Sequence, residues 1–441
     1  MKSWMKLVCV FVLVMLTLGA CAPGAQQPAA VKGDDAAQTD DNAPITVWID
    51  TTRQAAVDAF KAKYPDKAAL IKEEIVDRGQ FPSKVLLFNN TNQGWPDVVF
   101  AEPSIVGRVA DAAHNFPLDL KGYVDEKVVA DFGNAITPCW FDGKLFCLRN
   151  DVAQDVLYYN KPLMDEFGYA VPTTWEEYLE LSDKVAAEHP GYIMGAFGEA
   201  WGWAVYYWGA SCPLNEVVSV SQVRINPDDP RCAKASNLVD HMIANGTISK
   251  LDPFDPAFVQ LVTENKLLML PEASWFGEYI FGGKADSLYY KTAEGQLGVA
   301  TPLKWKDEAA PVTATHGGSA WTVSRHTKNP KLAVEFTLFV TTADEYQSTG
   351  PTFPGYLPVA DKWAKTIQSN PLYANDPYPI FKESVGFISA LDTQPRYDWV
   401  TVVTKWVKEA NQSGKTMAEV LTPMADELKS LAEAEGYEVV K

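Results

Sequence analysis

Apolar and polar positions alternate along the chain in segments that predict strands followed by helices. The run ITVWID (45–50) is apolar and β-branched and predicts a strand, and residues 51–65 have the spacing of an amphipathic helix. The order repeats with a strand in 70–76, a helix in 83–94 and a buried strand in 96–102. Strands that alternate with helices predict an α/β fold with mainly parallel sheets covered on both faces.

Later segments extend this pattern. The sequence DVLYYNKPLMDEFG predicts a strand that leads into a helix ended by Gly168, and Thr173 and Glu176 have the spacing of a capping box for the next helix. A buried strand is predicted over 266–270. Further strands are predicted in 296–303 and 318–324, and residues from 361 onward are mostly helical.

One predicted helix, within GEAWGWAVYYWGAS (198–211), is unusually aromatic. At about 100° per residue, two of its rings share one face and three lie on the opposite side. The first set is Trp201 and Trp208, and the second is Trp203, Tyr206 and Tyr207. One buried stripe explains only one set, so another lobe, a ligand or both should cover the second face. Core packing and a ligand surface both stay open.

The N-terminus has the order of parts found in a bacterial lipoprotein signal. Lys2 and Lys6 flank the start of a short apolar run, which LGAC (18–21) follows. We expect residues 1–20 to be removed and Cys21 to carry lipid as the new N-terminus. Residues 21–43 are rich in Ala, Gln, Pro and Asp and predict a disordered tether.

This signal predicts an extracytoplasmic protein held to the cell membrane by its lipid, in the periplasm or on the outer face of the cytoplasmic membrane. An ordinary signal peptide or an uncleaved anchor is the alternative. No transmembrane segment follows residue 20.

The net charge argues against nucleic acid as a partner. It is −18 for the whole chain, and removal of residues 1–20 takes away two lysines and no acid, which leaves −18 − 2 = −20. Such a chain is repelled by nucleic acid and by anionic lipid. We expect the acidic residues to serve solvation, and an anionic ligand is disfavoured.

Four cysteines remain after the predicted signal and the lipidated Cys21: Cys139, Cys147, Cys212 and Cys232. An even number in an oxidising compartment predicts two disulfides, for which three pairings are possible. In CWFDGKLFC a three-residue loop, 142–144, would place Cys139 opposite Cys147 on a hairpin, which leaves Cys212 to pair with Cys232. Four free buried thiols are the alternative.

Signals for catalysis, cofactors and metals are weak. The chain has no GxxxxGK, GxGxxG, HExxH or GxSxG motif. No two cysteines are separated by two residues and the five histidines are scattered, so neither a metal site nor a cofactor is expected. Carboxylate pairs are common in an acidic chain, and composition alone therefore leaves a glycosidase open.

Several stretches, taken together and in order, resemble the extracellular solute-binding proteins of sugar ABC importers, the maltose-type group. The most characteristic is VLYYNKPLMDEFGYAVPTTWEEYLELSDKV (156–185). ENKLLMLPEASW (264–275), GGSAWTVSRHTKNPKLAVEFTLFV (317–340) and GYLPV (355–359) are similar to later parts of that family. ITVWI and WPDVVF are similar to its first and third strands.

The resemblance implies a two-lobe, type II periplasmic-binding-protein-like fold with the ligand in a cleft between the lobes. It also implies three hinge crossings, which we place near residues 152, 300 and 345. The N-terminal lobe would contain 44–152 and 300–345, and the C-terminal lobe 153–299 and 346–441. Closure of such lobes on a ligand is a hinge motion.

The resemblance also implies a site. Sugar rings in this group stack on aromatic side chains, because a pyranose has an apolar C–H face, and polar side chains bind the hydroxyls. By position, the stacking residues would be Trp275, Trp201 and Trp399, and the other contacts Glu199, Arg53, Asp50, Glu102, Gly317 and Gly318. Core packing is the alternative for each tryptophan, and simple solvation for Arg53 and Glu102.

The function expected from the resemblance is a lipid-anchored, monomeric, non-enzymatic receptor that delivers a carbohydrate to an ABC permease. One alternative is a binding protein for a polyamine or another non-sugar solute, for which acidic and aromatic side chains would also serve. The other is an extracellular carbohydrate-active enzyme.

Overall fold

A computed structural model describes residues 39–441 apart from 220, 284–289, 314 and 390–394. The predicted signal peptide, Cys21 and most of the predicted tether lie outside these residues. The last residues of the predicted tether are among the described ones and are ordered. The backbone N–H of Asp40 donates to the carbonyl of Lys328, and the Asn329 amide donates to the carbonyls of Asp41 and Ala43. Residues 40–43 are thus held against the folded chain.

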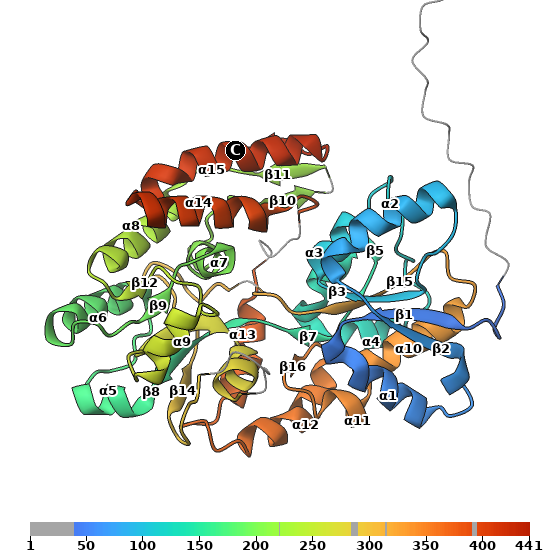
Figure 1. Cartoon of the computed structure of the whole chain (residues 1–441), viewed down its shortest axis with the longest axis horizontal. Helices are drawn as coiled ribbons and strands as arrows, with labels where there is room; N and C mark the ends of the chain where they lie inside the picture. Colours follow the sequence, from blue (N-terminus) through green and yellow to red (C-terminus); the bar gives the residue numbers. More distant parts are fainter. Residues whose placement is uncertain (1–38, 220, 284–289, 314, 390–394) are drawn as a thin grey trace, which may run out of the picture. The chain divides into compact units, whose positions relative to one another are not determined.

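The first lobe is built on a five-stranded sheet with the order β2-β1-β3-β15-β6 (Figure 1). Its strands are β1 (Ile45–Ile49), β2 (Ile71–Ile75), β3 (Val98–Ala101), β15 (Ala320–Val323) and β6 (Leu148–Arg149). β1 runs parallel to β2 and β3, but β15 runs antiparallel to β3 and β6. The first three strands are confirmed, and the mainly parallel pairing holds for only half of this sheet.

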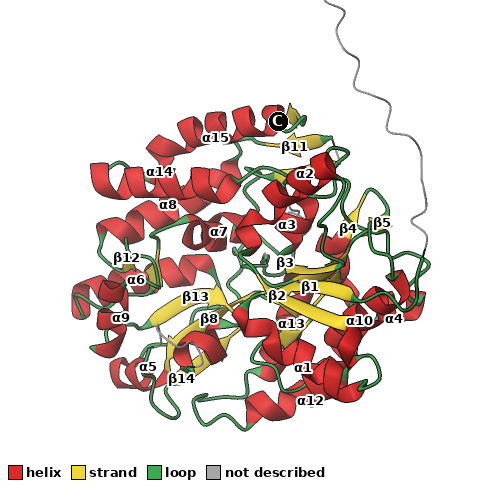
Figure 2. Ribbon diagram, turned by 45° about the vertical axis from the view of Figure 1, so that its right-hand side comes forward, coloured by secondary structure: helices red, strands yellow, loops and turns green. Residues whose placement is uncertain are grey.

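Helices cover both faces of this sheet, as Figure 2 shows. They are α1 (Gln54–Lys63), α2 (Phe81–Thr91), α3 (Pro103–Arg108), α4 (Glu126–Ala130), α10 (Pro330–Thr342) and α11 (Asp344–Gln347). Phe60 of α1 packs on Phe336 of α10, with ring centroids 5.0 Å apart. Trp48 of β1 packs edge-on against Phe81 and Phe88 of α2. Both faces of β1 are buried for this reason, which explains its nearly continuous apolar sequence.

The second lobe is built on the sheet β13-β8-β14, in which β8 pairs antiparallel with both neighbours. Its strands are β8 (Asp155–Asn160), β13 (Met269–Ala273) and β14 (Leu297–Ala300). The expectation of parallel pairing is wrong for this lobe, because apolar periodicity carries no information on strand direction. The strand predicted over 266–270 begins three residues later, where pairing with β8 decides its start.

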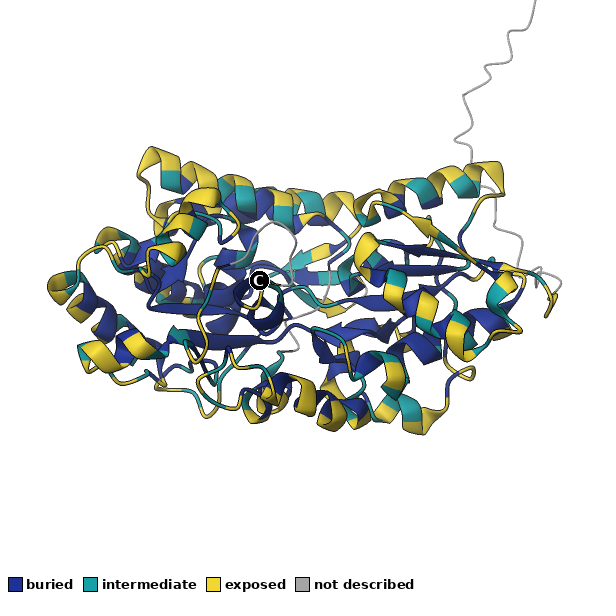
Figure 3. Cartoon of the chain, turned by 60° about the horizontal axis from the view of Figure 1, so that its bottom comes forward, coloured by how far each residue is buried: buried dark blue, intermediate teal, exposed yellow. Residues whose placement is uncertain are grey.

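Two groups of helices cover the two faces of this second sheet. On the Leu157 side lie α5 (Lys161–Phe167), α6 (Trp175–Glu188), α7 (Ala200–Gly209), α8 (Pro230–Ala244), α14 (Trp399–Ser413) and α15 (Met417–Ala434). On the Tyr158 side lie α9 (Pro256–Thr263), α12 (Leu357–Gln368) and α13 (Tyr378–Ser384). Figure 3 shows buried strands in the interior and helices with exposed outer faces.

Helix ends follow the local sequence. Gly168 ends α5 in the left-handed conformation, as predicted. The capping box of α6 is formed by Thr174 and Glu177, one residue later than the predicted pair Thr173 and Glu176. Thr173 instead donates to the Glu177 carboxylate from outside the helix. Both pairs have the same spacing, so the sequence could not choose between them.

Both predicted disulfides are present, Cys139–Cys147 and Cys212–Cys232. The first closes the hairpin of β4 (Trp140–Phe141) and β5 (Lys144–Leu145). Its turn has two residues, Asp142 and Gly143, rather than the three predicted, since Phe141 pairs directly with Lys144. Both turn residues have positive φ, as tight hairpin turns require.

Short strands complete the fold. β10 (Glu216–Ser219), β11 (Gln222–Arg224) and β17 (Glu438–Val440) form a small sheet, so the C-terminal segment is not wholly helical. β9 (Gly195–Ala196) pairs with β12 (Ile248–Ser249), and a π-helix spans Gly277–Phe281. None of the described helices is long and apolar enough to cross a membrane.

The chain passes between the two lobes near β7 (Asp151–Val152), which pairs with β16 (Phe353–Pro354). A further bridge joins Gln154 to Thr315. Leu303 and Trp305 pack with the helices on the Leu157 side of the second sheet. The lobe boundaries near 152, 300 and 345 remain a prediction.

Candidate ligand site

Polar side chains of the first lobe gather where the parallel strands β1, β2 and β3 end. Asp50 follows β1, Arg78 lies just after β2, and Glu102 follows β3. Arg78 joins the two acids: its Nη1 lies 2.6 Å from Glu102 Oε1, and its Nε lies 3.5 Å from Asp50 Oδ2. The carboxyl edge of a parallel sheet is a common place for ligands. The structure therefore brings Asp50 and Glu102 together through Arg78, and ligand contact by the two acids stays a prediction.

Arg53 lies beside this group but is buried. Its guanidinium stands 4.4 Å from the centroid of Phe100, over which Arg78 also lies. Its Nη2 lies 3.9 Å from Asp151 Oδ2 and 3.4 Å from Ser319 Oγ. Burial lowers the pKa of Arg53, but Asp151 and its other acidic neighbours outweigh that effect and raise it. The Nε atom is buried without a hydrogen-bond partner among the described residues.

A short segment, 316–319, connects this polar group with the second lobe. Asp151 accepts hydrogen bonds from the backbone N–H and the hydroxyl of Ser319. Gly317 and Gly318 have positive φ, and a Cβ on Gly318 would come within 2.3 Å of Arg149 Nη2. Only glycine at 318 meets both requirements. Ligand contact by the two glycines stays a prediction.

Trp201 and Trp275, the two predicted stacking residues that are partly exposed, both contact His316. The Trp201 ring stacks on the imidazole with centroids 5.0 Å apart and an interplanar angle of 12°. Trp275 Nε1 donates to the His316 carbonyl at 2.9 Å, and its ring lies nearly parallel to that of Phe254. One residue thus holds both indoles.

His316 is fixed by acids from two strands. Its Nδ1 lies 2.5 Å from Glu272 Oε1 of β13 and 3.8 Å from Asp155 Oδ1 of β8, and all three side chains are buried. Burial lowers the pKa of His316, but Glu272, Asp155 and Glu199 outweigh it and raise the pKa to about 9. The imidazole is therefore a cation at neutral pH. Because the Trp201 indole stacks on it, a cation–π interaction stabilises the position of the indole.

The same three residues also form a candidate metal site. Within the described part of the chain, they are the one group of histidine and acid side chains with possible metal-ligand atoms that all lie within 4.8 Å of one another. Sequence spacing could not reveal it, since the members come from β8, β13 and the 316–319 segment. The close contact of His316 with Glu272 is that of an ion pair, and we assign it that role.

The aromatic helix α7 is mostly core. Trp203, Tyr206, Tyr207 and Trp208 are all buried, and Trp203 stacks on Tyr207. The face with Trp201 and Trp208 is covered by α14 of the same lobe, whose Trp399 lies 5.2 Å from both rings. On the opposite face the Tyr207 hydroxyl shares a hydrogen bond with Ser236 of α8. The expectation that a helix apolar on both faces needs another lobe or a ligand is therefore wrong for all rings but Trp201. A helix that is apolar all round is a buried helix.

Trp399 and Glu199 are the other two predicted site residues beside Trp201, one in ring contact with it and one at the start of α7. Trp399 is 4% exposed and supports Trp201 in this structure, so direct ligand contact by Trp399 stays a prediction. Glu199 caps α7 by accepting from the N–H of Gly202 at 2.9 Å. Burial raises the pKa of Glu199, although hydrogen bonds from Trp201 and Gly202 oppose the shift.

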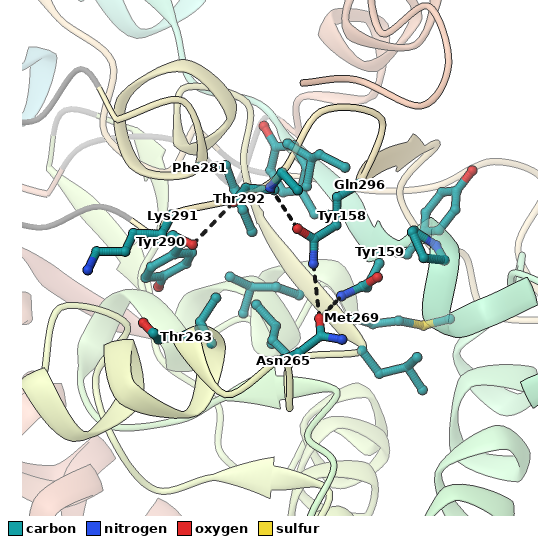
Figure 4. Close-up of a pocket in the computed structure, with 18 of the residues that line it drawn as sticks. Tyr158, Tyr159, Thr263, Asn265, Met269, Phe281, Tyr290, Lys291, Thr292 and Gln296 are labelled. Atoms are coloured by element: carbon teal, nitrogen blue, oxygen red, sulfur yellow. Dashed lines mark hydrogen bonds between the residues drawn. The ribbon is translucent and has the colours of Figure 1, made fainter. Parts of the chain in front are cut away.

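A separate cavity of about 360 Å³ lies within the second lobe, between β8, β13, β14 and α9 (Figure 4). Its polar side chains bind one another: the amides of Asn160 and Gln296 both donate to Asn265 Oδ1. Gln296 Oε1 accepts from the N–H of Ala293. None of the predicted site residues lines this cavity, and its satisfied polar groups point to packing rather than to a ligand.

Comparison with known proteins places the chain among solute-binding proteins. The bacterial extracellular solute-binding protein family matches residues 55–377. An arabinooligosaccharide-binding protein of Halalkalibacterium halodurans is 22% identical over 376 residues, which cover 81% of this chain and 78% of that protein.

Two solved structures have a similar fold. The galacto-N-biose-/lacto-N-biose I-binding protein of Bifidobacterium longum, in complex with lacto-N-biose, has a TM-score of 0.73 at 18% identity and covers 91% of this chain and 100% of its own. UgpB of Mycobacterium tuberculosis, in complex with glycerophosphocholine, has a TM-score of 0.66 at 17% identity. The match covers 89% of this chain and 99% of UgpB. The likeness extends over almost the whole chain and shows that the chain has the fold of these binding proteins, which confirms the expected fold class.

Proposed function

Because the chain belongs to the family of bacterial extracellular solute-binding proteins, we propose that it captures a carbohydrate outside the cytoplasm and delivers it to an ABC import permease. The ligand would lie between two surfaces. The second lobe contributes the indoles of Trp201 and Trp275, and the first lobe contributes the polar group of Arg53, Asp50, Arg78 and Glu102. The arabinooligosaccharide-binding relative and the lacto-N-biose complex support a saccharide. No step of this function requires catalysis.

The observation that carries this proposal is the pair of partly exposed indoles held by His316, together with the unpartnered donor of Arg53. An indole face suits the C–H face of a sugar ring. A buried N–H without a partner is costly, and a ligand hydroxyl would remove that cost. We assign stacking to the free areas of Trp275 and Trp201, and hydroxyl binding to Arg53 and its neighbours.

The charges of the site favour a neutral ligand over a polyamine. Acids of the site are already opposed by a cation or a donor: Glu272 by His316, Asp151 by Ser319 and Arg53, and both Glu102 and Asp50 by Arg78. A polycation would need carboxylates that are not yet paired. Because UgpB has a similar fold and was solved with glycerophosphocholine, a zwitterionic solute is the second candidate for the ligand of this chain.

We further propose that the chain is a monomer held to the membrane by lipid on Cys21. The order of charge, apolar run and LGAC supports the anchor. The family description supports an extracellular location.

A screen by thermal shift, followed by calorimetry, tests the function. The ligands are arabino-, galacto- and maltooligosaccharides, lacto-N-biose, spermidine and glycerophosphocholine. A ligand that binds only the folded state raises the melting temperature, and excess ligand at 100 times Kd adds about 2.7 kcal/mol. Binding of a saccharide, recovered unchanged by chromatography, supports the proposal. Binding of spermidine alone, or release of cleaved sugar, overturns it.

A further inference from the structure

A groove of about 480 Å³ lies between the two lobes, away from the indoles described above, and we propose that it is a second saccharide subsite that selects oligosaccharides over monosaccharides. This inference rests on the proposed function and deepens it. The first-lobe wall is the end of α3 and the disulfide hairpin, and the second-lobe wall is β10, Arg396 and Tyr437. A volume of this size is that of a small-molecule site.

The first-lobe wall presents an aromatic surface on a rigid support. Trp140 is 38% exposed at the start of the hairpin, and Phe141 stacks on Phe146 with centroids 5.9 Å apart. The Cys139–Cys147 disulfide and the two-residue turn hold this hairpin in one conformation. Trp140, Phe141 and Phe146 line the groove together, and a contiguous apolar surface is a recognised mark of a binding site. A fixed ring also loses little entropy when a ligand stacks on it.

The second-lobe wall offers hydrogen-bond donors beside another aromatic ring. The Arg396 guanidinium lies 4.4 Å from the centroid of Tyr437, and its Nη2 donates to the carbonyl of Glu435 at 3.0 Å. Its Nε is buried and has no partner among the described residues. Asp111, Asp142, Lys144 and Ser219 also line the groove. Aromatic faces with mixed donors and acceptors suit a sugar, which is apolar on its faces and polar at its rim.

The groove lies close to the main site. Arg396 precedes Trp399 by three residues, so their Cα atoms are at most about 11 Å apart. The Trp399 ring in turn lies 5.2 Å from that of Trp201. The proposal requires a saccharide that stacks on Trp201 and extends to this groove around the buried Trp399, whereas a single sugar ring cannot occupy both places.

The two lobes contribute opposite walls, which distinguishes this groove from the cavity inside the second lobe. A ligand that bridges both walls stabilises the closed arrangement of the lobes. The second subsite thus couples ligand length to closure.

The test compares Trp140→Ala with Tyr123→Ala, which removes another exposed ring of the first lobe that does not line the groove. The probes are the monosaccharide to the hexasaccharide of the sugar series that binds in the screen. Calorimetry measures Kd, and a denaturant melt checks that each variant is folded. We expect W140A to weaken binding of the longer saccharides by about 5- to 30-fold and to leave the shortest binding ligand unchanged. Tyr123→Ala should change neither.

The outcomes are separable. If no saccharide of any length binds the unaltered chain, the proposed function fails. If saccharides bind but W140A weakens none of them, or weakens all lengths equally, the second subsite is wrong. If W140A impairs uptake in cells while Kd stays unchanged for every length, the groove contacts the permease instead, which also overturns the subsite.

Discussion

The indole of Trp201 stacks on the imidazole of His316, with ring centroids 5.0 Å apart and planes within 12° of parallel. The imidazole is itself held by Glu272, and its backbone carbonyl accepts from Trp275. Both proposed stacking surfaces therefore depend on one buried ion pair. This relationship determines what His316 variants and pH should do.

Replacement of His316 by Gln should impair ligand binding and stability together. Gln keeps a hydrogen-bonding group but removes the charge opposite Glu272 and Asp155. Breaking a buried pair from one side typically costs about 3 to 5 kcal/mol, and a displaced Trp201 should weaken saccharide binding by about 10-fold. Calorimetry and denaturant melts measure both. His241→Gln, which breaks the exposed pair with Asp183, is the matched control and should change stability by less than about 1 kcal/mol. Unchanged affinity in H316Q would show that the stack does not position the ring.

Stability should fall as pH rises from about 6.5 to above 9. The pKa of His316 is about 9 in the folded chain, above its ordinary value of 6.5. A raised histidine pKa contributes stability that is fully present below the unfolded pKa and is lost as pH rises through the folded pKa. The shift corresponds to roughly 2 to 4 kcal/mol.

The pH profile has two internal checks. H316Q should remove most of the loss between pH 6.5 and 9. His326 should act in the opposite direction, because burial and Arg325 lower its pKa to about 4, so its contribution is lost only below about pH 6.5. A wild-type profile that is flat from pH 6.5 to 9 would contradict a protonated His316.

Trp275→Ala should mainly affect binding. Its ring is partly exposed, so truncation leaves no closed cavity, while lost stacking and burial amount to roughly 1.5 to 4 kcal/mol. We expect Kd to rise by about 10- to 1,000-fold, measured by calorimetry, with a small change in the melt. A large stability loss at unchanged Kd would place Trp275 in the core.

Trp399→Ala should mainly affect stability. The side chain is 4% exposed and lies against Trp201, Trp203 and Trp208. Removal of a buried tryptophan should cost about 3 to 5 kcal/mol in a denaturant melt. If the melt is unchanged and Kd rises, Trp399 contacts the ligand directly, as the resemblance implied.

Cys21→Ala should release the protein from the membrane. Lipid on Cys21 follows from the lipoprotein-like signal, and the anchor is lost without it. Fractionation of cells and mass spectrometry of the N-terminus measure the outcome. An intact Met1, or cleavage away from Cys21 in the unaltered chain, would reject the lipoprotein assignment.

The sequence by itself determined the first three strands and the family resemblance. Apolar runs located β1 and β3 because both faces of these strands are buried. β2 is an edge strand, in which only Ile71 is buried. The even cysteine count and the hairpin spacing predicted both disulfides, and the structure confirms them. The family resemblance named Asp50 and Glu102, and the structure places both at one edge because residues that follow neighbouring parallel strands meet there. The same strand-end position could have pointed to Arg78 after β2.

Only the tertiary structure decided which side chains share a site and which are core. His316, Glu272 and Asp155 are 44 to 161 positions apart in sequence, and strand pairing alone makes them neighbours. Strand direction in the second lobe depends on connections that periodicity does not encode. One face of α7 looked free because α14, which covers Trp201 and Trp208, comes almost 200 residues later. Burial is a property of the packed assembly, and a local sequence pattern cannot tell a ring that meets a ligand from a ring that meets another helix.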